Sequence, residues 1–297
     1  GLPVGLESPD EDDVVGLGTF KGKLLVFMTN NIQLWATDPD PSLIQLESVI
    51  ENGYVTYTDT IAPLGADLVF LSKAGFYSAG QMLYTDRMIA GDVGAPVAAI
   101  VLEKITADAA THEPIALNYS GNNQYICAIK DEMFVLTHST NAKLTAWSRY
   151  TMSSGSSING MCSYRELLYV KMNNASGDFI FGFDPAKYND DIAGSTTTNF
   201  DVQITSGFQT LGGSGRWKKI YGMDAMMIGE ANVQHRWDAR TPTAKTTAIT
   251  LSGDTRPAPM IPVELMTTEV SFDITQNSNT GLLFNGMTYH FHQLGEF

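Results

Sequence analysis

Short apolar runs separated by tight-turn signals recur along the first two thirds of the chain. The segment Val14–Asp40 contains three such runs, which are divided by turn residues at Lys21-Gly22 and at Asn30-Asn31. Runs of this length between Gly and Asn turns are typical of antiparallel strands joined as a meander. The pattern therefore predicts an antiparallel sheet near the start of the chain.

The same pattern returns further along the chain. Four leading runs, LLVF, LVFL, MFVL and LLYV, begin at Leu24, Leu68, Met133 and Leu167, at intervals of 44, 65 and 34 residues. Each run follows a polar or Gly-containing turn, and a second strand with an aromatic residue follows it. Repeated meanders of this kind are typical of a β-propeller, in which each sheet packs on its neighbours. We predict a β-propeller-like domain over residues 1–190 that is incomplete at its N-terminus.

One segment has helical periodicity. Ala98, Val101, Leu102 and Ile105 have the spacing of a single helix face, and Pro114 ends the run. We expect a helical insertion between two blades near residues 96–112, which also explains the longest interval between repeats.

The pattern of apolar and polar residues changes near residue 190. The segment Asp184–Asn199 is polar and rich in turn residues, and it has no apolar periodicity, which is typical of a domain boundary. Short strands without a blade-like repeat then predict a β-sandwich over residues 198–297. The expected strands are Phe200–Thr205, Arg216–Met227, Asn232–Asp238, Thr246–Leu251, Ile261–Met266, Glu269–Ile274 and Leu282–His292. The predicted fold class is all-β.

The charge of the chain limits what it can bind. With 18 basic and 32 acidic residues, the formal net charge is −14. Proteins that grip nucleic acid do so with Lys and Arg on the phosphates, so this composition argues against such a role. It is compatible with a wall past which DNA slides, because an acidic surface repels phosphate. No apolar run reaches 18 residues, so no membrane span is expected.

Residues with catalytic or metal-binding potential are few. Cys127 and Cys162 lie in expected strands without ligand spacing and are predicted to be buried free thiols. His290 and His292 share one face of a strand, but no third ligand is near in the sequence, so a polar strand face is the favoured interpretation. We find no nucleophile elbow, phosphate-binding loop, zinc-protease helix or dinucleotide fingerprint. We therefore expect no enzymatic activity, no metal and no cofactor.

The basic cluster GGSGRWKK has two interpretations. Arg216, Lys218 and Lys219 are candidates for a loop that touches DNA or an acidic partner. The favoured alternative is a turn followed by a strand in which Trp217, Ile220 and Tyr221 are buried, because three cations are few for phosphate binding.

Several of these segments, in this order, resemble the tail hub proteins of short-tailed bacteriophages. These are the packaged-DNA stabilisation proteins, which are related in role to the tail nozzle. The likeness spans most of the chain and is carried by short hydrophobic motifs. The segments are VVGLGTFKGKLLVFMTNNIQLWA, ADLVFLSKAGFYSAG, the helical PVAAIVLEKITADAA, RWKKIYGMDAM and TGLLFNGMTYHF.

The resemblance implies a structural protein of the virion tail, made in the host cytoplasm. It implies a homo-oligomeric ring, most often a hexamer, below the head-tail adaptor, which retains packaged DNA and forms part of the ejection channel for double-stranded DNA. Tail fibre, spike or needle proteins would be further partners. In such a ring the acidic loops would face either the lumen or a seam between subunits, or they would form an ordinary acidic exterior. The candidate residues are Asp10, Glu11, Asp12, Asp13, Asp38 and Asp40.

Two other classes of function stay open at this stage. A propeller-type polysaccharide-degrading or carbohydrate-binding tail protein would need exposed aromatic platforms, for which Trp35, Trp147 and Tyr150 are candidates. A cellular interaction scaffold is less favoured because WD and kelch signatures are absent. Fold alone does not decide among these classes.

Overall fold

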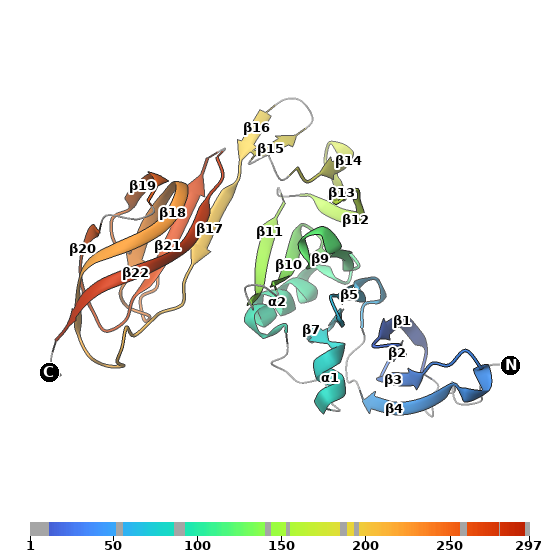
Figure 1. Ribbon diagram of the computed structural model, residues 1–297. Coiled ribbons are helices and arrows are strands. Elements are labelled where there is room, and N and C mark those ends of the chain that lie inside the picture. The colour runs from blue at the N-terminus through green and yellow to red at the C-terminus, as the bar shows by residue number, and fades with distance from the viewer. Residues whose placement is uncertain are drawn as a thin grey trace. The chain divides into compact units, whose positions relative to one another are not determined.

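The computed structural model describes residues 12–51, 56–85, 93–139, 144–152, 155–184, 189–192, 196–255, 260–278 and 280–294. Strands make up most of the regular structure, so the predicted all-β class is confirmed (Figure 1). The chain divides into two compact units, Gly1–Phe183 and Asp184–Phe297.

The first unit consists of four consecutive antiparallel meanders, each paired in chain order. The first sheet is β1 (Val14–Phe20), β2 (Lys23–Met28), β3 (Asn31–Ala36) and β4 (Gln45–Glu51), and the second is β5 (Ala62–Leu64), β6 (Asp67–Ser72) and β7 (Gly75–Ser78). The third is β8 (Ile115–Tyr119), β9 (Gln124–Ile129), β10 (Glu132–Ser139) and β11 (Leu144–Thr151), and the fourth is β12 (Ser157–Tyr164), β13 (Leu167–Asn174) and β14 (Gly177–Gly182). Single 3₁₀ turns lie at Pro41–Leu43, Thr58–Thr60, Ala95–Val97 and Ser120–Asn122.

Each of these sheets packs face to face on the next one. Phe70 of β6 contacts Phe27 of the first sheet, with ring centroids 4.9 Å apart, whereas Phe76 of β7 contacts Tyr125 of the third sheet at 5.9 Å. Because side chains alternate along a strand, a sheet covered on both faces needs an unbroken apolar run. The runs LVFL and YICAI are therefore continuous because both faces of β6 and β9 are buried. This stacking is compatible with a propeller-like arrangement, and β8 lies beside both β5 and β12.

Two glycines in β1 allow the first sheet to approach the second closely. A Cβ atom on Gly16 would lie 2.5 Å from Cδ1 of Ile61, and one on Gly18 would lie 2.6 Å from Cδ2 of Leu68. A side chain at either position would therefore displace the Ile61 or Leu68 side chain that packs over the glycine. The Gly-x-Gly pattern of the opening motif therefore leaves room for Ile61 and Leu68 to pack over β1.

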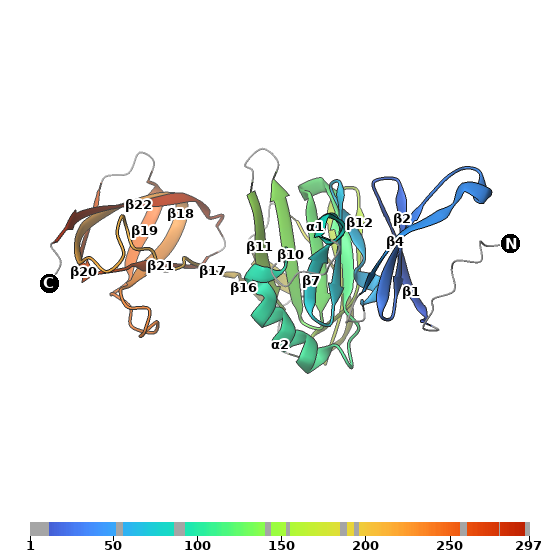
Figure 2. The same cartoon turned by 90° about the horizontal axis from the view of Figure 1, so that it is seen from below.

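The predicted helical insertion is confirmed. Helix α2 (Ala98–Asp108) follows the 3₁₀ turn Ala95–Val97 and packs against β7 and β9 (Figure 2). A second helix, α1 (Ala79–Thr85), follows β7 and was not expected. It has only seven residues, with Met82 buried in the core and Leu83 packed against it, so it is too short to show a helical period in the sequence.

The second unit begins within the predicted boundary segment. This segment is not simply a coil, because β15 (Asn189–Ile192) and β16 (Thr196–Asn199) form a hairpin in it. The unit then contains β17 (Asp201–Thr205), β18 (Lys218–Arg236), β19 (Ile249–Asp254), β20 (Ile261–Thr267), β21 (Ser271–Asn277) and β22 (Leu283–Gln293).

A single six-stranded sheet, organised on β18, encloses the core of the second unit. The strands β19, β20, β21 and β22 all pair antiparallel with β18, and the long strand bends at bulges near Gly222 and Met226. We expected two strands, Arg216–Met227 and Asn232–Asp238, and this expectation is wrong. The intervening Gly229 adopts a φ of +119° inside one continuous strand.

Candidate assembly surfaces

The fourth sheet of the first unit is covered on one face only. Leu168, Val170 and Met172 of β13 are buried against the third sheet. The alternate residues Tyr169 and Lys171 point to the opposite face, where Lys171 is exposed. Burial along β13 and β14 therefore alternates, in contrast to the continuous burial of β6 and β9.

The outer side of this sheet carries large exposed apolar side chains. Pairing places Cys162 opposite Tyr169 and Lys171 opposite Ile180, so these residues form one surface. Ile180 is 75% exposed and Tyr164 is 59% exposed. We call this surface the terminal face and define it by Cys162, Tyr164, Tyr169, Lys171 and Ile180. Contiguous exposed apolar groups on a soluble protein mark an interaction site.

The strand β14 adds an open edge to the terminal face. Within the part of the chain that the structure describes, β14 pairs with β13 and with no other strand. The first and third sheets each have four strands, whereas the fourth sheet has three. An unpaired strand edge offers its N–H and C=O groups to another chain.

The first predicted acidic loop stabilises a turn. The carboxylate of Asp12 accepts hydrogen bonds from the backbone N–H of Asn30 at 3.1 Å and from Nδ2 of Asn31 at 3.0 Å. It thereby closes the turn between β2 and β3. The side chain of Asp13 is exposed, and its carbonyl oxygen accepts a bond from the N–H of Thr29 at 3.1 Å. Asp10 and Glu11 lie outside the described residues.

The second acidic loop forms consecutive Asx turns between β3 and β4. Asp38 accepts a hydrogen bond from the N–H of Asp40 at 2.9 Å. Asp40 in turn accepts from the N–H of Ser42 at 3.0 Å and from its hydroxyl at 2.8 Å. These bonds hold the pKa of Asp40 below its usual value, the backbone bond having the larger effect. Asp38 and Asp40 are exposed carboxylates that also shape their own loop.

The basic cluster divides between the interior and the surface. Lys218 is fully buried, and its Nζ donates to the carbonyl oxygens of Gly213 at 2.6 Å, Arg216 at 2.8 Å and Thr268 at 3.1 Å. Burial lowers the pKa of the Lys218 ammonium group, and the nearby Arg216 charge adds to this effect. Arg216 and Lys219 are exposed, so Lys218 is a structural residue and not a contact for a partner.

The expected burial of Trp217, Ile220 and Tyr221 is wrong at two of the three positions. Ile220 is buried, but Trp217 is 41% exposed and Tyr221 is 37% exposed. Strand alternation explains the result, because Lys218 and Ile220 point inward while Trp217, Lys219 and Tyr221 point outward. The sequence RWKKIY is compatible with this alternation of inward and outward side chains. It was not expected, because a lysine on the inner face contradicts the usual preference for apolar side chains there.

Two of the three predicted sugar platforms belong to the core. Trp35 is 3% exposed, and Trp147 stacks on Phe76 with centroids 4.6 Å apart while its Nε1–H donates to the carbonyl of Val93 at 2.7 Å. Only Tyr150 of the three is exposed, at 46%.

The two cysteines also differ from expectation. Both are free, and Cys127 is buried as predicted, where burial raises the pKa of its thiol. Cys162 is exposed on the terminal face, so the prediction that it is buried is wrong. The reason is that β12 contributes Cys162 to the uncovered side of its sheet.

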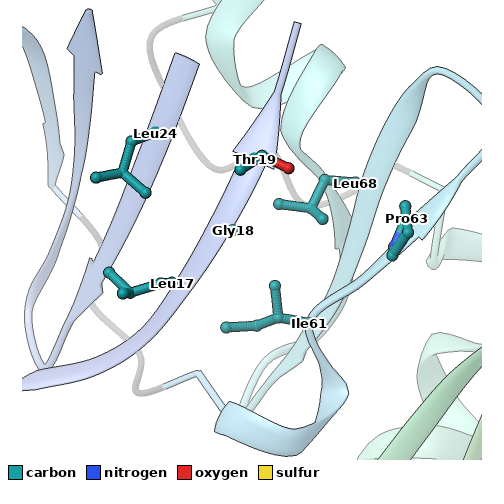
Figure 3. A pocket seen from close by; sticks show the side chains of 7 residues that line it. All are labelled: Leu17, Gly18, Thr19, Leu24, Ile61, Pro63 and Leu68. Atoms are coloured by element: carbon teal, nitrogen blue, oxygen red, sulfur yellow. The ribbon is translucent and has the colours of Figure 1, made fainter. Parts of the chain in front are cut away.

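An apolar hollow lies beside β1 in the first unit (Figure 3). Its volume is about 430 Å³. No ionisable side chain lines it, so it offers no group for acid–base catalysis. The lining residues are Leu17, Gly18, Thr19, Leu24, Ile61, Pro63 and Leu68.

The described residues contain neither a metal-ligand cluster nor a membrane-spanning helix. No group of three or more His, Cys, Asp or Glu side chains is arranged there to hold a metal ion. His290 instead places its Nε2 2.7 Å from Oδ2 of Asp224, and His292 stacks on Tyr221. No helix in these residues is both long enough and apolar enough to cross a bilayer.

Comparisons with known proteins do not assign the chain to a family. No family model matches, and no curated protein matches. Among solved structures, the chain is similar to an exo-beta-1,3-galactanase from Phanerochaete chrysosporium with beta-1,3-galactotriose. The two share 9% identity at a TM-score of 0.27, over 94% of this chain and 81% of that one. A similarity at this level supports no argument about function.

Proposed function

We propose that this chain is a structural subunit of a homo-oligomeric ring, the tail hub or nozzle of a short-tailed bacteriophage. In this proposal the ring lies below the head-tail adaptor, retains packaged DNA and forms part of the ejection channel. The observation that carries the proposal is the terminal face, an uncovered sheet face at the end of a stack of covered sheets. The order of the motifs that resemble tail hub proteins supports the phage assignment.

The terminal face favours association because a partner that covers it removes apolar side chains from water. Burying a side chain such as Ile180 contributes about 1.5–3 kcal/mol relative to leaving it exposed. Tyr164 adds an aromatic surface, and the guanidinium of Arg165 lies 5.1 Å from the centre of its ring. Aromatic and Arg side chains are enriched where protein interfaces are buried. A neighbouring subunit would cover this face as the sheets of the first unit cover one another.

The charge distribution supports passage of DNA instead of tight binding. The first unit, Gly1–Phe183, contains 20 acidic and 10 basic residues, a formal charge of −10. Several such units around one axis would produce a strong negative potential that repels the duplex from the wall. In this proposal the protein is not an enzyme, and its role is mechanical and electrostatic.

The test is the mass of the purified chain in solution, with and without an intact terminal face. We expect the unaltered chain to form an oligomer in mass photometry and Ile180→Lys to shift it to the monomer. The matched control is Ile100→Lys on α2, since Ile100 is 42% exposed outside this face. We expect this control to remain oligomeric.

Cys162 provides an independent readout of the same contact. Because Cys127 is buried, maleimide should label only Cys162 in the folded chain. We expect the label to react slowly in the oligomer and rapidly in the Ile180→Lys variant. A chain that is monomeric at all accessible concentrations and labels rapidly would contradict the proposal.

A further inference from the structure

The second unit also has an exposed apolar surface, on the outer side of β18, β20 and β22. Pairing places Lys219 between Met266 of β20 and His292 of β22, and Gly222 beside His290. The large apolar side chains on this surface are between 37% and 57% exposed. We call it the aromatic–methionine face and define it by Trp217, Lys219, Tyr221, Met226, Met260, Met266, His290 and His292.

Contacts with neighbouring side chains hold this face in place. The Tyr221 ring stacks on His292, with centroids 4.9 Å apart and planes at 27°, and lies 6.1 Å from the His290 ring. His290 is fixed in turn by Asp224, at 2.7 Å. Side chains that are already ordered lose less entropy when a partner binds.

Gly222 lets a methionine lie flat over the middle of the face. A Cβ atom on Gly222 would lie 2.6 Å from both Cγ and Sδ of Met260. The Met260 side chain therefore occupies the space above the glycine and joins the apolar residues on its two sides. Methionine is flexible and polarisable, and it adapts to the shape of a partner.

The charge of this face differs from that of the rest of the chain. Lys219 is exposed on this face, Asp224 is engaged by His290, and Glu264 is exposed on β20. With neutral histidines these three groups sum to −1, whereas the first unit carries −10. Copies of an acidic chain repel one another, so they can approach most easily where one partner carries little net charge.

We propose that the aromatic–methionine face of one copy docks the terminal face of the next copy, head to tail. This inference rests on the proposed ring and assigns the two surfaces that build it. Two different surfaces in contact make a heterologous interface, which closes into a ring if its rotation permits.

The exposed side chains of the aromatic–methionine face supply a large part of the area that a stable contact needs. A standard interface buries about 800 Å² per partner. Trp217, Tyr221 and the three methionines, each exposing on the order of 80–100 Å², supply about half of that area. Lys219, His290 and His292 lie among them and form the polar part of the contact.

Mixing two variants tests the head-to-tail arrangement. Met266→Lys damages only the aromatic–methionine face, and Ile180→Lys damages only the terminal face. We expect each variant alone to be monomeric and an equimolar mixture to form a dimer, because one intact contact can form and no second one can follow. Native mass spectrometry with one variant isotopically labelled identifies that dimer. Ser252→Lys on β19, exposed and away from the face, is the control that should leave the oligomer intact.

The possible outcomes separate this inference from the proposed function. If Ile180→Lys breaks the oligomer and Met266→Lys does not, the aromatic–methionine face is not the docking surface, although the ring proposal stands. If both variants are monomeric and stay so when mixed, the two faces are not partners. A chain that never assembles contradicts both proposals. Retention on a glycan array that Tyr221→Ala abolishes, with the oligomer unchanged, would assign the face to carbohydrate and overturn the inference.

Discussion

Lys218 is a buried cation whose hydrogen-bond partners among the described residues are backbone oxygens. Its Nζ bonds three carbonyls from two segments of the second unit, so it fixes the loop before β18 to the turn after β20. Lys218→Met should therefore lower the free energy of unfolding by about 2–4 kcal/mol, because it leaves buried acceptors without donors. Urea denaturation measures the change. Lys219→Met is the matched control, which should stay within about 0.5 kcal/mol of the unaltered chain.

His235 makes the second unit sensitive to acid. It is fully buried, its ring nitrogens have no hydrogen-bond partner among the described residues, and it packs edge-on against Tyr289 at 5.6 Å. Burial lowers its pKa from 6.5 to about 4. Between these values the unfolded chain binds a proton that the folded chain excludes, so stability should fall as the pH drops from 6.5 towards 4.

The size of this effect can be measured with one substitution. The lowered pKa of His235 corresponds to a loss of about 3 kcal/mol in the free energy of unfolding by pH 4. In His235→Phe the free energy of unfolding should depend less on pH between 6.5 and 4, which urea titrations at several pH values would reveal. An unchanged pH dependence would show that other groups cause the acid sensitivity.

At the scale of single elements, helix α2 is anchored by an ionic network. Asp108, 7% exposed, bonds Lys104 at 2.8 Å and Lys130 at 2.7 Å, and Lys104 also pairs with Asp131. Burial opposes ionisation of Asp108, but the two lysines hold its pKa below the usual value. The contribution of Asp108 to stability should thus be present above pH 3.8 and be lost at more acidic pH as the carboxylate is protonated.

Removing the Asp108 charge should loosen the helix. Asp108→Asn leaves two lysines partly uncompensated, and the expected loss is about 2–4 kcal/mol. Glu103→Gln, an exposed change on the same helix, should have little effect. Hydrogen exchange of α2 measures the local opening, and equal protection in the two variants would contradict the anchoring role.

Much of the element structure could be predicted because burial leaves a direct pattern in the sequence. The unbroken runs of β6 and β9 reflect sheets that are covered on both faces. In α2, Val101 and Ile105 are buried as their spacing predicts, whereas Leu102 of the same predicted face is 39% exposed. Helix α1 is too short to show a period, and β18 contains Gly229 at a φ of +119°, a residue that weakens the pattern of a strand interior. These features depend on tertiary pairing that a local pattern does not contain.

The candidate surfaces were harder to predict than the elements. The sequence marked Arg216, Lys218 and Lys219 as one cluster, but strand alternation separates them into inner and outer positions. The exposure of Cys162 and Tyr164 cannot be inferred from their sequence, because it depends on whether another sheet packs on that face of β12. Exposed apolar groups are recognised only when the packing of their neighbours is known.

At the scale of the whole molecule, the proposed ring gives the acidic loops a testable role. If Asp13 and Asp38 line the channel, Asp13→Lys combined with Asp38→Lys should slow DNA ejection and make it dependent on salt, because new cations bind phosphate. Neither of these exposed side chains closes the β2–β3 turn, a role that belongs to Asp12. Virions that carry both changes and eject at the normal rate would place these loops on the outside.

A reconstruction of the assembled protein by electron cryomicroscopy, made without imposed symmetry, tests the central claim most directly. We expect a closed ring in which Ile180 and Tyr164 of each copy are covered by the neighbouring copy. A monomer, or a ring in which the terminal face points to solvent in every copy, would contradict it.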